Sequence, residues 1–299
     1  MDVTGAWDTM VAMHPCGWFW HTRGWLEYCA AFDGGNQNLS WVQSSQYMRV
    51  AGICPLVWSG GGLSGNGDPL AWPLALEAGA LHAMLDGIDQ VASARCAAHV
   101  AFRGSPLAAA PDVAPFLARG YQDVSWRSRV VDLTQSEEVL WRGLRKSYKP
   151  LIHKIEREWE IVADGTGELA GAYAAVHRQS RAGEQTPRPA RTYEFPTEWI
   201  RNGHAFLVGA QGSNGWVAFA YVFLYKGGAY YGSGPSLVPN VQHAILWRAV
   251  LEAKRRGATL FELGWAGRSM DRKERAIEFF KAGFGGVEVP LVVVEKRFG

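Results

Sequence analysis

A segment near the end of the chain repeats apolar residues with the period of an α-helix. Residues 271–286 read DRKERAIEFFKAGFGG, with apolar side chains three and four positions apart and a run of glycines at the end. This spacing predicts an amphipathic helix that the glycines stop. The positions expected to face a core are Ala276, Ile277, Phe280 and Phe284. The apolar run VPLVVVEK that follows is typical of a β-strand.

A similar segment occurs in the first half of the chain. Residues 116–121 read FLARGY and residues 279–284 read FFKAGF, and a polar turn and an apolar strand follow each. A repeat at this distance indicates two similar domains. Ala118 corresponds to Lys281 at a position that we expect to face the core. Because an unpaired ammonium is costly to bury, we expect Lys281 to reach a cleft, the alternative being a lysine that extends into solvent.

Helical and strand patterns alternate through the first half. Residues 21–32 (HTRGWLEYCAAF) predict a short helix with Thr22 as its N-cap. Runs rich in β-branched and aromatic residues predict strands between further helices. In chain order these elements are strands 38–45 and 49–59, helix 74–94, strand 98–102, helix 112–120 and strand 126–133. The glycine-rich stretch 60–73 lacks the GK[ST] ending of a phosphate-binding loop, so we expect a flexible loop near a substrate.

The second half opens with a long helix and continues with a meander. Thr134 and Glu137 have the spacing of a capping box, and Pro150 should kink or split the helix that runs to Trp159. A helix that contains Tyr173 and an arginine-rich loop come next. Short connections then join three strands, and a helix and a strand precede the 271–286 helix. These elements are strands 204–211, 216–227 and 228–236, helix 240–257 and strand 259–267.

This order of elements predicts an α/β protein of the α+β type. We expect two domains, each a mixed sheet flanked by helices. A chain of 299 residues has room for two such domains, each large enough to bury a core. With the boundary placed after the strand at 126–133, the expected domains are residues 1–134 and 135–299.

The composition is typical of a globular protein. Apolar residues make up 48% of the chain and charged residues 19%, and we expect neither a signal peptide nor a membrane span. Four cysteines without short paired spacing are typical of reduced thiols. We therefore expect a cytoplasmic protein without a metal site, and a monomer. Among the fourteen tryptophans, Trp25 and Trp265 are candidates for a cleft that holds a flat or hydrophobic group.

Basic residues concentrate locally although the net charge is only +2. Such clusters attract phosphates, and the alternative is a solvated helix face. The two clusters that could hold the acceptor stem of a tRNA are Arg145, Lys146 and Lys149, and Lys254, Arg255 and Arg256. The loop 178–195 adds four arginines, whose guanidinium groups suit capture of a carboxylate or a phosphate.

Three segments of the second half resemble the Fem-type aminoacyl transferases. They are YYGSGPS, AILWRAVLEAKRRGATLFELG and DRKERAIEFFKAGFGG. HTRGWLEYCAAF and RVAGICPL resemble the opening of the same family, so the likeness spans nearly the whole chain, with FFKAGFGG as its most specific part. Members of this family build peptidoglycan cross-bridges. The resemblance implies two tandem GNAT-like domains and an amide-forming reaction that needs no metal or redox cofactor.

The resemblance also implies roles for single residues. Lys281 and Phe280, which match the family's Phe-Lys pair, are candidate catalytic residues, and Lys281 would stabilise an oxyanion or hold a donor phosphate. Tyr230 or Tyr231 would lie near the leaving oxygen, with Tyr231 as the preferred positioning group. Arg181 would anchor the acceptor.

The chain departs from the family at two expected contacts. The first-domain lysine of the family has no counterpart near Trp25, where only Arg23 is close, and Gln185 lies near the position of a family tyrosine. These departures weigh against a UDP-linked acceptor, and slightly favour a small peptide natural product over a cell-wall precursor. The general base is not identified, and His204 and His243 are weak candidates.

Three functions remain open from the sequence. The Q/R-x-x-G-x-G/A turn that binds the pyrophosphate of CoA is absent from the chain. We therefore expect an aminoacyltransferase that moves an amino acid from aminoacyl-tRNA to a primary amine of a peptide acceptor. The alternatives are an acyl-CoA-dependent N-acyltransferase and a non-catalytic relative that binds RNA or a nucleotide.

Overall fold

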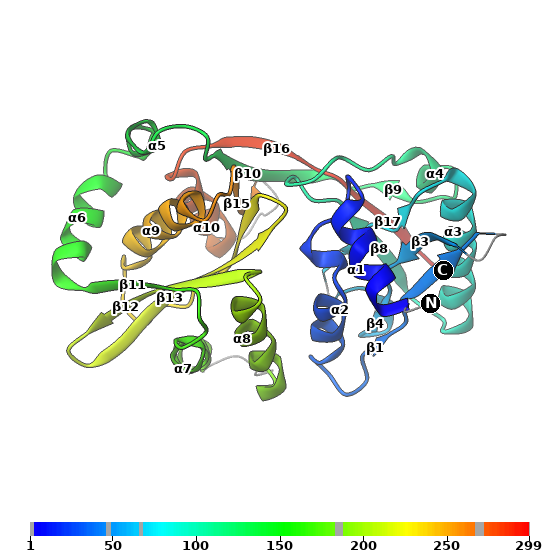
Figure 1. The fold of residues 1–299 in the computed structure, drawn as a ribbon, viewed down its shortest axis with the longest axis horizontal. Coiled ribbons are helices and arrows are strands. Elements are labelled where there is room, and N and C mark those ends of the chain that lie inside the picture. The colour runs from blue at the N-terminus through cyan, green and yellow to red at the C-terminus, as the bar shows by residue number, and fades with distance from the viewer. Residues whose placement is uncertain (1–2, 46–48, 66–67, 183–187, 267–271, 299) are drawn as a thin grey trace. The chain divides into compact units, whose positions relative to one another are not determined.

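The computed structural model describes residues 3–45, 49–65, 68–182, 188–266 and 272–298 (Figure 1). The chain divides into two compact units. Unit 1 contains residues 1–126 and 290–299, and unit 2 contains residues 127–289. In the described parts of the chain, no helix is both long enough and apolar enough to cross a membrane.

Unit 1 contains two sheets with helices packed against them. The larger has the strand order β1-β4-β5-β8-β17-β9, with β6 also paired to β8, and the smaller has the order β2-β3-β7. The strands are β1 (Gln37–Asn38), β2 (Trp41–Ser44), β3 (Val50–Cys54), β4 (Val57–Ser59), β5 (Gly62–Leu63), β6 (Leu70–Ala71), β7 (Leu74–Ala75), β8 (His99–Arg103), β9 (Gln122–Asp123) and β17 (Val293–Arg297). The helices are α1 (Val3–Met13), η1 (Phe19–His21), α2 (Arg23–Ala30), α3 (Ala78–Ala94) and α4 (Ala114–Leu117).

The amphipathic segments predicted in unit 1 form helices. The segment 21–32 begins with the end of the 3-10 helix η1 and continues as α2. Thr22 is confirmed as the N-cap of α2, because its side chain accepts a hydrogen bond from Trp25 N at 3.3 Å. The helix α3 buries Met84 and Ile88 and packs on β2, β3 and β7.

Unit 2 is built around one mixed sheet with the strand order β11-β12-β13-β14-β15-β10-β16. β14 and β15 are parallel, whereas the pairs β11–β12, β12–β13, β13–β14 and β10–β15 are antiparallel. The strands are β10 (Trp126–Asp132), β11 (Glu160–Asp164), β12 (Ala205–Gly212), β13 (Gly215–Tyr225), β14 (Gly228–Ser233), β15 (Leu260–Ala266) and β16 (Val287–Leu291). The helices are α5 (Glu137–Gly143), α6 (Tyr148–Glu158), α7 (Ala170–Ser180), η2 (Ala190–Tyr193), α8 (Glu194–Arg201), α9 (Gln242–Arg255) and α10 (Arg272–Ala282).

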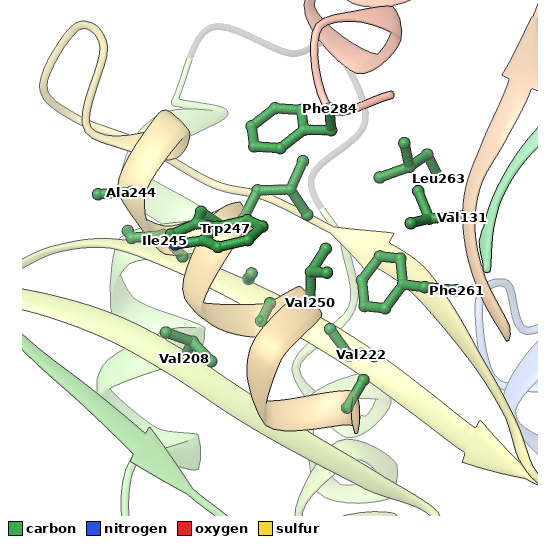
Figure 2. Close-up of a cluster of buried hydrophobic side chains, with 14 of the residues drawn as sticks. Val131, Val208, Val222, Ala244, Ile245, Trp247, Val250, Phe261, Leu263 and Phe284 are labelled. Carbon is green, nitrogen blue, oxygen red and sulfur yellow. The ribbon is translucent and has the colours of Figure 1, made fainter. Parts of the chain in front are cut away.

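Helices cover both faces of the sheet in unit 2. Side chains alternate between faces along a strand, and β13 shows this directly. Ala220 and Val222 belong to the core that α9 covers, whereas the ring of Tyr221 lies 5.5 Å from that of Tyr173 on α7. Figure 2 shows the core beneath α9, where Trp247 and Val250 lie among side chains of β12, β13 and β15.

The long helix predicted at the start of the second half is two helices. α5 ends at Gly143 and α6 begins at Tyr148, so Pro150 lies in the first turn of α6, where a missing N–H is tolerated. The predicted capping by Thr134 is wrong. Ser136 caps α5 by accepting a hydrogen bond from Val139 N at 3.3 Å, and Thr134 donates instead to Asp132 at 2.6 Å.

Each half of the chain contributes a strand to the sheet of the other half. β10 follows the elements of unit 1 but pairs with β15, and β17 follows the elements of unit 2 but pairs with β8 and β9. The compact units therefore differ from the expected domains 1–134 and 135–299. Residues 127–134 belong to unit 2, and residues 290–299 belong to unit 1. Periodicity identifies a strand but does not say which sheet it joins, which is why the boundary after residue 134 does not match.

Candidate functional site

Lys281 is a buried cation in the last turn of α10. It is only 9% exposed, and its Nζ atom lies 4.9 Å from the ring centroid of Trp265. The expectation that the aligned position in the first half is also buried was wrong, because Ala118 is exposed. The two helices differ in phase: Phe116 is fully buried, whereas its counterpart Phe279 is 64% exposed. In α10 itself Ala276, expected to face the core, is exposed.

Gly264 on β15 provides the space for Lys281. Its φ of +91° is unfavourable for residues with a Cβ atom, and a Cβ there would lie 2.9 Å from Lys281 Nζ. The same position lies 3.8 Å from the hydroxyl of Tyr230. The register of β10 against β15 shifts at this point, where Arg129 pairs with Gly264 and Val130 with Glu262. This bulge and the glycine bring Lys281 and Tyr230 to one place on β15.

Besides Lys281 on α10, a second buried charged residue is Glu262, which lies on β15 two residues before Gly264. It is 4% exposed, and its Oε1 atom accepts a hydrogen bond of 2.6 Å from the hydroxyl of Ser128, which is fully buried. Glu262 pairs with Tyr230 in the parallel β14–β15 register. Burial lowers the pKa of Lys281, attraction by Glu262 raises it, and the net effect is a pKa of about 8 instead of 10.5. The lysine is therefore mostly charged at neutral pH but close to titration.

The C-terminal end of α10 is held by the loop that precedes α6. Arg145 N donates to Gly283 O at 2.8 Å, and the hydroxyl of Tyr148 donates to Phe280 O at 3.0 Å. A Cβ on Gly283 would overlap the ring of Tyr148, so only glycine fits there. These bonds satisfy carbonyls that a helix end leaves unpaired. They fix the turn that carries Lys281.

Phe280, predicted as a catalytic residue, packs against other rings. Its ring lies 5.2 Å from that of Phe284, 5.0 Å from His243 and 6.2 Å from Tyr148. The side chain is half-buried against the core of unit 2. Its contacts orient α10 and so orient Lys281.

The two neighbouring tyrosines of β14 point to different partners. The hydroxyl of Tyr231, the preferred candidate, donates to Gln242 Oε1 at 3.4 Å, and burial raises the pKa of Tyr231. Gln242 in turn donates to Phe219 O and Pro235 O, both at 2.9 Å. The structure thus places Tyr231 at the start of α9, and it is the hydroxyl of Tyr230 that, like the Lys281 ammonium, lies close to the space at Gly264.

The candidate histidines lie in aromatic surroundings. His243 has Nδ1 2.8 Å from Asn240 O and its ring 4.4 Å from that of Tyr148. Burial and the charge of Arg145 lower the pKa of His243, with burial as the larger cause. The ring of His204 lies 5.7 Å from that of Tyr225.

Arg181 lies at the end of α7 in a group of arginines around Tyr193. The guanidinium groups of Arg188 and Arg178 lie 4.4 Å and 5.3 Å from the centroid of the Tyr193 ring. Burial raises the pKa of Tyr193, while Arg188, Arg178 and Arg181 act to lower it. The Tyr193 hydroxyl is 2.9 Å from Nδ1 of buried His177. Gln185, which lies in sequence near the position of the family tyrosine, falls outside the described residues.

The first expected basic cluster is partly engaged within unit 2. Arg145 stacks on the ring of Phe279 at 3.6 Å and donates to the Tyr148 hydroxyl at 3.0 Å. Lys149 lies 6.0 Å from the Trp141 ring, and Lys146 is exposed.

All three residues of the second basic cluster (Lys254, Arg255 and Arg256) are bound to partners within the chain. Lys254 donates to Leu133 O at 2.6 Å, and both Arg255 and Arg256 pair with the buried carboxylate of Glu252. One carboxylate between two guanidinium groups reduces the positive charge that this surface presents.

The candidates in unit 1 lie on α2. Arg23 forms an exposed ion pair with Asp8 at 3.4 Å. Trp25 is half-buried, with its ring 4.4 Å from that of Trp20 and 5.0 Å from that of Tyr28. This aromatic row offers a partly accessible flat surface in unit 1.

The sequence interpretation missed Glu262, Ser128 and Gly264. A signal was present, because Glu262 interrupts the apolar strand LFELG and a glutamate between buried neighbours needs a partner. In the described residues no cluster of histidine, cysteine or carboxylate side chains is arranged to hold a metal ion.

No family model matches the sequence, and no curated protein is similar to it. Solved structures are similar. FemX matches with a TM-score of 0.70 and 12% identity over 98% of this chain and 96% of FemX. The C-terminal domain of a putative lysylphosphatidylglycerol synthetase from Agrobacterium fabrum matches with a TM-score of 0.63 and 13% identity, covering 99% of this chain and 92% of that domain.

A tandem GNAT protein from the clavulanic acid biosynthesis pathway matches with a TM-score of 0.58 and 17% identity, over 100% of this chain and 95% of that protein. At these identities the likeness concerns the fold. The likeness to Fem-type proteins seen in the sequence is thus confirmed at the level of the fold, and this chain has a tandem GNAT-like fold that FemX also has.

Proposed function

We propose that this chain is an acyltransferase that forms an amide by moving an amino acid from aminoacyl-tRNA to a primary amine of a peptide acceptor. One observation carries the proposal. Lys281 is 9% exposed, and its ammonium group lies 2.9 Å from the position that a Cβ atom on Gly264 would occupy, 3.8 Å from which lies the hydroxyl of Tyr230. A charge buried in this way stabilises a fold poorly, so it is typical of a site that acts on a substrate.

The chemistry needs a positive charge at one point. The amine nitrogen of the acceptor attacks the ester carbonyl, a C–N bond forms, and the C–O bond to the ribose breaks. The amine loses one proton and the ribose oxygen gains one. Lys281 stabilises the oxyanion of the tetrahedral intermediate, an effect worth about 10²–10³ in turnover for a well-placed donor. Because the ester is already activated, the reaction requires no cofactor.

Tyr230 takes the role first assigned to Tyr231. Its hydroxyl lies 3.8 Å from the same point on Gly264 that Lys281 approaches, within reach of a proton relay to the leaving oxygen. Tyr231 instead fixes the start of α9 through Gln242. Phe280 orients the helix turn that carries Lys281.

Arg181 is the proposed anchor of the acceptor. The combined charge of Arg178, Arg181 and Arg188 around Tyr193 suits a carboxylate or phosphate group of the acceptor. The expected effect of Arg181→Ala is a higher KM for the acceptor with a smaller change in kcat, because an anchor acts on ground and transition states alike.

Two observations support aminoacyl-tRNA as the donor. The start of α9 lacks the paired glycines of a CoA-binding turn, and the side chain of Gln242 donates there to Phe219 O and Pro235 O. Two neighbours named putative lysylphosphatidylglycerol synthetase and L-PGS have a similar fold, and the first name describes a product that carries a lysyl group. An acyl-CoA donor is the second candidate, because the similar protein from the clavulanic acid pathway is described as a form without AcCoA.

The test supplies each donor separately. Charged tRNA and acyl-CoA are each mixed with the protein and a panel of peptide amines, and ribonuclease is added to a parallel tRNA reaction. Transfer that requires charged tRNA and ends with ribonuclease supports the proposal, and binding should then weaken steeply with salt. Turnover with acyl-CoA alone would establish the second candidate. RNA binding without turnover would indicate a non-catalytic protein.

A further inference from the structure

We infer that Glu262, held by Ser128, keeps Lys281 positively charged and is therefore the positioning residue on which the action of Lys281 depends. The inference rests on the proposed function, in which Lys281 stabilises negative charge. It assigns a purpose to a buried carboxylate that lies on the same strand as Gly264.

The position of Glu262 has no explanation in packing alone. Its neighbours Phe261 and Leu263 are fully buried in the core that α9 covers, so alternation directs Glu262 to the opposite face of β15. A carboxylate that is 4% exposed is costly unless it is hydrogen-bonded and compensated by charge. Ser128 supplies the hydrogen bond at 2.6 Å.

Two opposing effects act on Lys281. Burial disfavours the charged ammonium and lowers its pKa, while the carboxylate of Glu262 favours it. Among the described residues, Glu262 is the charged group whose attraction acts on Lys281. Tyr230 on β14, Trp265 on β15 and Ser128 on β10 contribute neutral groups on this side of the sheet, and Glu278 precedes Lys281 by one turn on α10 itself. Without Glu262, this attraction would be lost and the pKa of Lys281 would fall further below its ordinary value.

A role for Glu262 as the general base is less consistent with its surroundings. A carboxylate that accepts a hydrogen bond from a buried hydroxyl is stabilised in its ionised form. Such a group takes up a proton reluctantly, which makes it a weak base. It is well suited to compensating a neighbouring positive charge.

The first arm of the test measures Lys281 directly. The 13C shift of the Lys281 Cε atom is titrated by NMR in lysine-labelled protein and assigned by its loss in Lys281→Met. The expected midpoint is about 8 in the wild-type chain, and Glu262→Gln should lower it by about one to three units. Ser128→Ala, which leaves the carboxylate in place, should lower it less.

The matched control is Glu252→Gln. Glu252 is also a buried glutamate of unit 2, at 5% exposure, but its partners are Arg255 and Arg256. This variant should leave the titration of Lys281 unchanged. An unchanged or raised midpoint in folded Glu262→Gln protein overturns the inference.

The second arm measures the pH profile of kcat/KM for transfer. If Lys281 acts as a cation, activity falls as pH rises through its pKa, and Glu262→Gln should move this alkaline limb to lower pH. Glu262→Asp should restore part of the shift. Loss of the acid limb with an unmoved alkaline limb would identify Glu262 as a base and overturn the inference. The NMR arm needs no substrate, so a shifted midpoint together with absent transfer would contradict the proposed function alone.

Discussion

The Nζ atom of Lys281 lies 2.9 Å from the position that a Cβ atom on Gly264 would occupy. The ammonium group therefore depends on the absence of a side chain at that residue. Gly264 also has a φ of +91°, which places the strand bulge next to the lysine. The geometry of one glycine thus sets the position of the buried charge.

Gly264→Ala should reduce transfer by displacing Lys281, and should also destabilise unit 2. Strain at positive φ costs roughly 1–2 kcal/mol. Gly227→Ala is the matched control, because Gly227 has a φ of +75° but its nearest neighbour would be 3.9 Å from the new Cβ. Unfolding in urea and transfer rates are compared for both variants. Equal loss of transfer in both would show that strain, and not displacement of Lys281, is responsible.

Substitution of Tyr230 should affect turnover, whereas substitution of Tyr231 should affect stability. Tyr230→Phe should lower turnover with little change in stability, because its hydroxyl and the Lys281 ammonium both lie close to the space at Gly264. Tyr231→Phe should lower stability by about 0.5–1.5 kcal/mol through loss of its bond to Gln242 and leave turnover nearly unchanged. Steady-state kinetics and thermal unfolding of both variants check this. A larger kinetic effect of Tyr231→Phe would make Tyr231 the positioning group.

The stability of unit 2 should depend on pH through Lys281. Its pKa falls from 10.5 to about 8 on folding, so between these values the unfolded chain binds more protons and stability rises with pH. The penalty of burying the charge is fully present below pH 8 and is lost towards 10.5. It amounts to about 3 kcal/mol. Urea unfolding from pH 7 to 10.5 should show this rise in the wild-type chain and not in Lys281→Met. Parallel curves would mean that Lys281 titrates normally.

The strand exchange predicts which fragment of the second half folds. β10 lies between β15 and β16 in the sheet of unit 2, and the fragment 135–299 lacks it. The fragment 127–289 retains nearly all of it and should unfold cooperatively, whereas 135–299 should not. Circular dichroism during thermal unfolding distinguishes them. A cooperative transition of equal stability in 135–299 would mean that β10 is dispensable.

Local patterns in the sequence predicted most elements of unit 2. The strands of the meander, the helix at 240–257 and the break before Pro150 follow from periodicity and turn residues, which act over a few neighbours. The assignment of β10 and β17 to sheets depends on contacts between distant residues. No periodicity contains that information.

The site was predicted in part. Lys281 was singled out because it corresponds to Ala118 in the repeat and to the lysine of the family's Phe-Lys pair. The structure places it in a buried position, although Ala118 itself is exposed. The choice between Tyr230 and Tyr231 depended on which face of β14 each occupies, and a bulge between β13 and β14 falls at this point. Glu262 and Ser128 are 134 residues apart, so their pairing could not be expected from spacing.

The central claim is that the charge of Lys281 drives amide formation. Single-turnover transfer from labelled aminoacyl-tRNA to a peptide amine tests it, with wild-type protein, Lys281→Ala and the control Lys154→Ala. Lys154 is an exposed lysine of α6, paired with Glu158. We expect a transfer rate at least about 10²-fold lower in folded Lys281→Ala and an unchanged rate in Lys154→Ala. A wild-type rate in folded Lys281→Ala would contradict the claim.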